Sequence, residues 1–247
     1  MTFTNGLVLL LSIWILTGCS QFLASEKDTA VVVTNTDKND ILSPIQKQAE
    51  YLRSQGNLYK TSQLGASISS ETSEQFEQAL RLKQQGKLSD GKKGFLQLAQ
   101  RSPALSGVWL QLALINKQLS TQQQNDDETL LTERLDYLNK AISANQHNYY
   151  AHNELAQVLR QQGQFKQALK HYQLAVESWP AFAEAYLNRG ILYDLYMGKK
   201  QLALQDYQLY QALSEQESRQ VQGWIIDLQR QISQAQSITN TEGQNNG

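Results

Sequence analysis

Apolar positions recur at helical spacing through most of the chain, most regularly over residues 149–182. Two apolar stripes lie on either side of Gly163, and Pro180 follows the second stripe. Their members are Leu155, Ala156, Leu159, Ala168, Tyr172 and Ala175. Residues three and four positions apart share one face of a helix, and glycine favours a turn. The pattern therefore predicts two antiparallel helices joined by a short turn.

Neighbouring segments carry the same pattern at a spacing of about 34 residues. Tyr207 follows Tyr172 by 35 positions, in a fourth unit that spans residues 183–217. In a first unit, over residues 72–105, Phe95 takes the place of Tyr172. The turns of these three units are expected at Gly86, Gly163 and Gly198.

The second unit carries a polar insertion. Its first helix opens near Trp109 and its second closes near Ala141. Phe95 and Tyr172 are 77 positions apart, which is two repeats plus nine residues. The extra residues fall in the polar run 120–128, where an extended turn is expected. Such a loop either contacts a partner or is an insertion that the fold tolerates without using it, and both alternatives stay open.

A further amphipathic helix is expected over residues 218–234. Its apolar face consists of Val221, Trp224, Ile225, Leu228 and Ile232. This arrangement suits a capping helix that covers the last repeat. The opposite face lacks the basic excess that is typical of a membrane-surface helix. Residues 235–247 are polar and predict a disordered tail.

The first 18 residues have the pattern of a signal peptide. An apolar run over residues 6–16 is shorter than the roughly 20 residues that span a bilayer. The run ends in Leu-Thr-Gly-Cys, whose cysteine is Cys19. We therefore expect residues 1–18 to be removed on export.

Residues 19–70 are rich in polar side chains and predict a flexible tether. Within it, Ser43 and Pro44 have the residue types that begin a helix, so a short helix containing Ala49 is expected there.

Two resemblances follow from these patterns. The units resemble tetratricopeptide repeats (TPRs), which implies an all-α, TPR-type α-solenoid over residues 71–217, with about four helix–turn–helix units and a C-terminal capping helix. The Leu-Thr-Gly-Cys sequence resembles the lipobox of bacterial lipoproteins, which implies that Cys19 carries lipid, palmitate included. Ser20 stands where an Asp would imply retention in the inner membrane. The resemblance thus implies anchoring to the outer membrane, with the body in the periplasm.

In tetratricopeptide proteins the first helix of each unit lines a concave groove that holds a partner segment. Carried over by repeat position, the groove residues are Phe76, Leu80, Lys83, Leu110, Leu114, Lys117, Asn153, Gln157, Arg160, Leu187, Ile191 and Asp194. The apolar members predict an exposed stripe of the kind that marks a partner site. The alternative is that neighbouring helices or the tether fill this stripe. Leu110 and Leu187 stand where recognition of a C-terminal carboxylate needs polar groups, so that mode is not expected.

The composition and the motifs that the chain lacks argue against several classes of ligand and activity. The net charge of -1 lacks the positive excess that is typical of proteins that bind nucleic acid. The single cysteine allows no internal disulfide. No zinc or serine-nucleophile motif contains the histidines, which are His147, His152 and His171. We therefore expect no enzyme activity, no metal, no cofactor and no small-molecule substrate.

The sequence as a whole predicts a lipid-anchored adaptor that binds another protein in its groove. The resemblance extends to periplasmic TPR adaptors such as type IV pilus pilotins and cell-wall hydrolase scaffolds. It implies a partner in pilus biogenesis, energy-coupled transport or a cell-wall complex. The alternative is a structural lipoprotein that assembles with copies of itself.

Overall fold

A computed structural model describes residues 42–63, 68–123 and 128–245. The signal peptide, Cys19 and the first part of the predicted tether lie outside these ranges. Within them the regular structure is α-helical. The helices are α1 (Pro44–Ser54), α2 (Leu58–Ser62), α3 (Ser70–Gln84), α4 (Leu88–Arg101), α5 (Ser106–Gln123), α6 (Glu128–Ala144), α7 (Tyr149–Gln161), α8 (Phe165–Ser178), α9 (Ala183–Leu195), α10 (Lys200–Leu213) and α11 (Arg219–Asn245).

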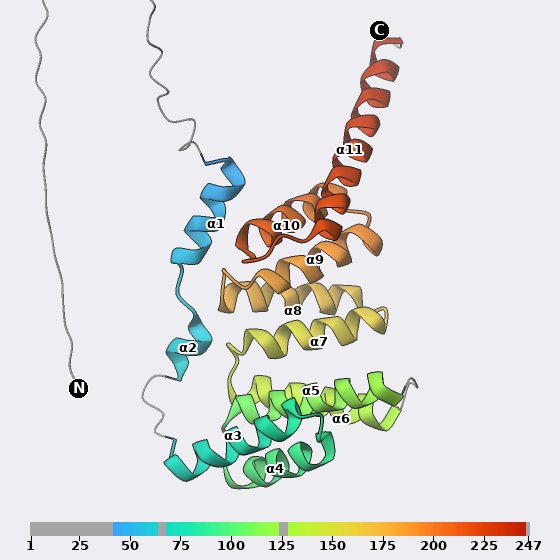
Figure 1. Cartoon of the computed structure of the whole chain (residues 1–247). Coiled ribbons are helices and arrows are strands. Elements are labelled where there is room, and N and C mark those ends of the chain that lie inside the picture. The colour runs from blue at the N-terminus through green and yellow to red at the C-terminus, as the bar shows by residue number, and fades with distance from the viewer. Residues whose placement is uncertain (1–41, 64–67, 124–127, 246–247) are drawn as a thin grey trace, which may run out of the picture. The chain divides into compact units, whose positions relative to one another are not determined.

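Helices α3 to α10 pack as consecutive pairs. The pairs are α3–α4, α5–α6, α7–α8 and α9–α10, and the second helix of each pair packs on the first helix of the next (Figure 1). First helices also contact each other, α3 with α5 and α7 with α9. This arrangement is a TPR-type solenoid, so the predicted fold class is confirmed.

Glycines shape the units at two kinds of position. Gly86, Gly163 and Gly198 have positive φ values of 77°, 75° and 63°, which other residues rarely adopt. All three lie at the turns within their units, as the sequence predicted. Gly91 instead lies where helices meet closely, because an added Cβ would lie 3.2 Å from the backbone of Ala79.

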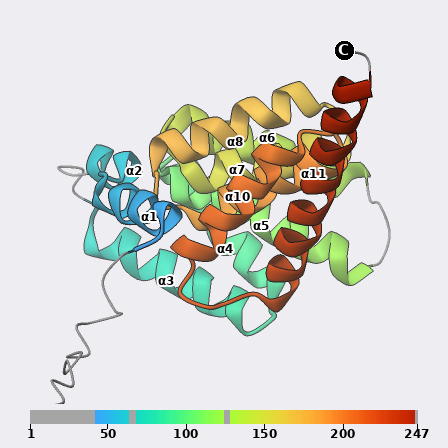
Figure 2. The same cartoon turned by 90° about the horizontal axis from the view of Figure 1, so that it is seen from above.

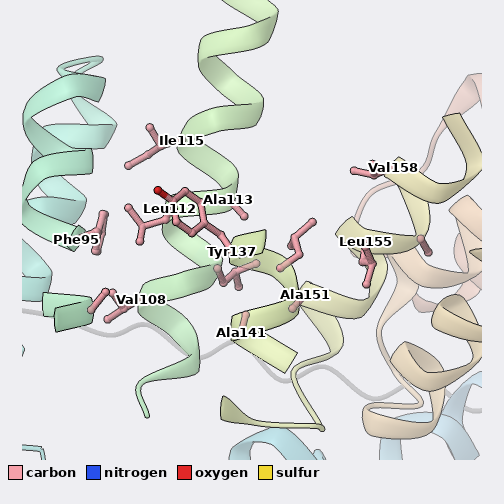
Figure 3. Packing of buried hydrophobic residues seen from close by; sticks show 14 of the residues in the cluster. Phe95, Val108, Leu112, Ala113, Ile115, Tyr137, Ala141, Ala151, Leu155 and Val158 are labelled. Atoms are coloured by element: carbon pink, nitrogen blue, oxygen red, sulfur yellow. The ribbon is translucent and has the colours of Figure 1, made fainter. Parts of the chain in front are cut away.

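The core runs between the paired helices. Phe95, Leu112, Ile115, Leu138 and Tyr172 are all fully buried, and Figure 3 shows part of this packing. Burying one large apolar side chain contributes about 1.5–3 kcal/mol. The repeat positions that carry the sequence pattern are thus the positions that hold the pairs together.

The insertion in the second unit takes a different form from the one expected. Helix α5 continues to Gln123 and α6 begins at Glu128, so only residues 124–127 fall outside the described ranges. These two helices have 18 and 17 residues, against 13 and 14 in α7 and α8. Most of the predicted polar loop therefore lengthens the helical hairpin, and the expected extended turn over 120–128 is corrected.

The predicted tether also requires correction, because residues 43–63 pack on the repeats. Ser43 caps α1 through a capping box with Gln46, as the sequence indicated. Ala49 is buried against Leu209 and Leu213 of α10, while Tyr59 of α2 meets Tyr149 edge-to-face at 5.9 Å. A flexible tether extending to residue 70 does not fit these contacts, since a helix as short as α1 or α2 needs packing to persist.

Helix α11 covers the last unit and then continues. Figure 2 shows α11 beside α10. Val221, Ile225 and Leu228 are buried there, and the Trp224 ring lies 5.3 Å from the Tyr207 ring, as expected of a cap. The helix runs to Asn245, so the prediction of a disordered tail from residue 235 is corrected. Within the described ranges, no helix combines the length and apolarity needed to cross a membrane.

Candidate functional site

Polar side chains link successive first helices of the units. Lys83 Nζ of α3 donates to Gln111 Oε1 of α5 at 2.7 Å. Lys117 Nζ of α5 then reaches α7, and Asn188 of α9 donates to Asn153 of α7 at 3.1 Å. We call this set the first-helix ladder. Its members are Lys83, Gln111, Lys117, Asn153, Glu154, Gln157 and Asn188.

Glu154 is the centre of the ladder's charge. Its two oxygens each lie 2.9 Å from Lys117 Nζ, and Arg134 of α6 donates to Oε2 at 2.8 Å. Burial lowers the pKa of Arg134, and the nearby Glu154 carboxylate partly offsets this effect. Burial also lowers the pKa of Lys83, again against the charge of Glu154. One carboxylate therefore serves several cations.

The predicted apolar stripe is less exposed than expected. Leu110 is buried, while Phe76, Leu80 and Leu114 are half-buried against the main core. Leu187 and Ile191 pack in the cluster that contains Val221 of α11. Neighbouring helices thus cover much of the predicted apolar stripe, which is partly and not fully exposed. Residues 43–63 pack against α10 and the start of α7.

The polar residues that were predicted to line the groove lie in two separate places. Asn153, Gln157 and Lys117 meet in the ladder, although Asn153 is itself buried. Arg160 and Asp194 lie apart from the ladder's hydrogen bonds. Arg160 covers the Tyr196 ring at 5.6 Å, and Asp194 accepts from the Tyr207 hydroxyl at 3.4 Å.

Sequence reasoning missed Gln111, Arg134, Glu154 and Asn188. A usable signal did exist, because Asn153 and Asn188 are 35 positions apart and Lys117 and Glu154 are 37 apart. Polar residues about one repeat apart on first helices occupy facing positions in adjacent units. Looking for such pairs finds two of the ladder's contacts.

The histidines make a contact that the sequence did not predict. Nδ1 of His152 lies 2.9 Å from Nδ1 of His171, and Nε2 of His152 lies 3.0 Å from the Gln146 carbonyl. Because that carbonyl requires a donor, His152 carries its proton on Nε2, and His171 donates from Nδ1. Among the described residues, no group of three or more His, Cys, Asp or Glu side chains is placed to hold a metal ion.

Comparisons with known proteins agree with this architecture. Residues 156–194, from α7 to α9, match the family model described as a TPR repeat. A comparison with curated protein sequences finds no match. The described helices and the matched repeat together agree with a solenoid of the tetratricopeptide-repeat type.

Several solved structures share the fold at low sequence identity. PilF of Pseudomonas aeruginosa is 16% identical with a TM-score of 0.55, over 66% of this chain and 69% of that one. MamA from residue 41 to its end, of Desulfovibrio magneticus RS-1, is 14% identical with a TM-score of 0.54, over 72% and 94%. A tetratricopeptide repeat protein from Parabacteroides merdae is 18% identical with a TM-score of 0.51, over 70% and 66%. At such identities the likeness concerns the fold alone.

Proposed function

We propose that this chain is a non-enzymatic adaptor that binds a segment of another protein along its first-helix ladder. The observation that carries the proposal is the ladder itself, which links four first helices through side-chain hydrogen bonds. Amide and charged groups such as Gln111, Lys117 and Gln157 are only half-buried, so a peptide can exchange hydrogen bonds with them.

We further propose that the adaptor is held at the periplasmic face of the outer membrane by lipid on Cys19. The partner would then be a protein of an envelope assembly, in pilus biogenesis, energy-coupled transport or a cell-wall complex. Two acyl chains suffice for stable attachment, since each buried methylene contributes about 0.8 kcal/mol. Mass spectrometry of the N-terminal peptide tests this anchor, and an unmodified thiol in the mature chain would contradict it.

Photo-crosslinking in living cells tests the adaptor proposal. A photoreactive phenylalanine at Leu114 or Gln157 should capture one partner protein, while the same residue at the exposed Gln173 of α8 should not. Equal capture at all three positions, or no capture at the first two, would contradict binding at the ladder. Capture of a second copy of the chain would instead support the self-assembling lipoprotein.

A further inference from the structure

A cavity lies where the long hairpin of the second unit meets the third unit. It has a volume of about 570 Å³. Its lining mixes apolar and polar side chains, including Leu130, Val158, Asn116, Lys117 and Arg134. Lys117 belongs both to this cavity and to the first-helix ladder, so the two surfaces are continuous.

Two buried polar side chains of the lining each have one atom without a hydrogen-bond partner. Asn116 is fully buried, and its Nδ2 donates to Glu133 Oε2 at 2.9 Å and to the Leu130 carbonyl at 3.4 Å. Both contacts are with acceptors, which identifies the unpaired atom as the Oδ1 oxygen. Arg134 is 8% exposed, and its Nε–H has no acceptor. A buried polar group without a partner costs about 1–3 kcal/mol, so each needs an explanation.

The charges around the cavity do not balance among the described residues. Ion pairs join Lys92 to Glu133, and both Lys117 and Arg134 to Glu154. Three cations therefore share two carboxylates, which leaves one positive charge in excess. Removing charges from water is expensive unless opposite charge compensates them. The surroundings thus favour an anion.

We propose that this cavity receives an acidic side chain from the bound partner segment, which makes acidic peptides the preferred ligand class. A carboxylate supplies acceptors for Arg134 Nε and Lys117, and the neighbouring peptide N–H supplies the donor that Asn116 Oδ1 needs. The aliphatic part of a glutamate suits the apolar walls at Leu130 and Val158. The inference rests on the proposed function, because the acidic residue enters from the segment bound on the ladder.

Peptide selection with the full-length chain tests this inference. A phage-displayed library of random 12-residue peptides should yield binders that contain Asp or Glu. Amidated synthetic copies should lose at least tenfold in affinity by calorimetry when that residue becomes Asn or Gln. Lys117→Gln and Arg134→Gln should each cause a similar loss, and the peptide change should then have little further effect.

Lys140→Gln is the matched control, since Lys140 is a half-exposed lysine of α6 that pairs with Asp136. Should Arg134→Gln fail to fold, Lys117→Gln alone decides, because its side chain is 39% exposed. Binders without acidic residues, or binders indifferent to Lys117, would overturn the inference and leave the adaptor proposal standing. Selection of no peptide would count against both.

Discussion

The junction between the second and third units differs sharply from the interior of the fourth unit. At the junction, Lys117, Arg134 and Glu154 form a charged cluster beside a cavity. In the fourth unit, Gly190 lies so close to Tyr207 that an added Cβ would be 2.7 Å from the ring. The same type of repeat is thus tightly packed within the fourth unit, whereas the junction between the second and third units contains charged side chains and a cavity.

The fourth unit also contains a buried charged pair, and within that pair each charge has its partner. Arg189 stands where a leucine is usual in the repeat, and it donates twice to Asp206, at 2.8 Å each. Burial raises the pKa of Asp206, although the bonds from Arg189 act in the opposite direction. One cation meets one carboxylate there, whereas the junction has a surplus of cations. The proposed binding cavity thus lies beside the surplus cations of the junction and not beside the matched pair of the fourth unit.

Tyr207→Ala should have the largest effect on the free energy of unfolding. The ring is 1% exposed and also supports Trp224 of α11. Removing a buried aromatic side chain costs about 3–5 kcal/mol. Urea denaturation followed by circular dichroism measures the loss. Tyr51→Ala is the control, because Tyr51 is 65% exposed and should change stability by about 0.5 kcal/mol or less. Equal losses in both variants would remove the contrast between the two regions.

Glu154→Gln should destabilise the junction by about 2 kcal/mol. A fully buried ion pair costs about 3–5 kcal/mol when one partner is removed, but Lys117 is 39% exposed and solvent screens its charge. Adding Lys117→Gln should recover part of the loss, since fewer cations then lack a carboxylate. A double-mutant cycle in urea measures the coupling. A neutral single substitution would show that the cluster contributes nothing to stability.

Gly190→Ala tests the tight packing directly. The new methyl group would contact the Tyr207 ring and Asp206, and overpacking costs about 1–3 kcal/mol. Alanine regains up to about 1 kcal/mol of helix propensity, so a net loss of about 1–2 kcal/mol is expected. Gly223→Ala on α11 should have the opposite sign, because no atom lies within 4 Å of its added Cβ. Thermal melts compare the two, and stabilisation by both would contradict close packing at Gly190.

Acid should weaken the third unit through its histidine pair. Burial, and then the charges of His152 and Lys170, lower the pKa of His171 to about 4, and burial also lowers that of His152. The unfolded chain binds protons below about pH 6.5, where the folded pair resists them, so stability falls as pH drops from 7 to 5. We expect a loss of roughly 1 kcal/mol, allowing for partial exposure to solvent.

His147, Lys170 and Glu177 line the same surface as this pair, so the pH dependence must be measured against a variant. His171→Gln should flatten the change in melting temperature between pH 7 and pH 5. An unchanged slope in that variant would show that the pair does not govern the response.

Most of the fold could be predicted from the local spacing of apolar residues and glycines within each repeat. Tyr172 and Gly163 specify a helix pair through contacts that lie within one repeat, so their spacing alone predicts it. The docking of α1 on α10 depends on Ala49, a small residue whose partner Leu213 is distant in sequence. Nothing in the local pattern of residues 43–54 identifies that partner.

The candidate site was harder to predict than the fold. A polar residue on a first helix either faces solvent or hydrogen-bonds to the next unit. The residue type alone does not tell which of these two environments it has. Lys117 and Gln157 were both predicted as groove residues and do contact each other, but their shared partner Glu154 was missed. The exposure of Leu110 was overestimated because burial depends on how closely adjacent units approach.

The docked position of α1 has a consequence for the order of folding. Arg53 donates to the carbonyl of Ala212, and the two residues are 159 positions apart. During synthesis from the N-terminus, α1 emerges long before α10, and no part of its docking surface on α10 yet exists. Since contacts distant in sequence form late, α1 should join the molecule as its last step. Until then its apolar face stays open to solvent and to other proteins such as chaperones.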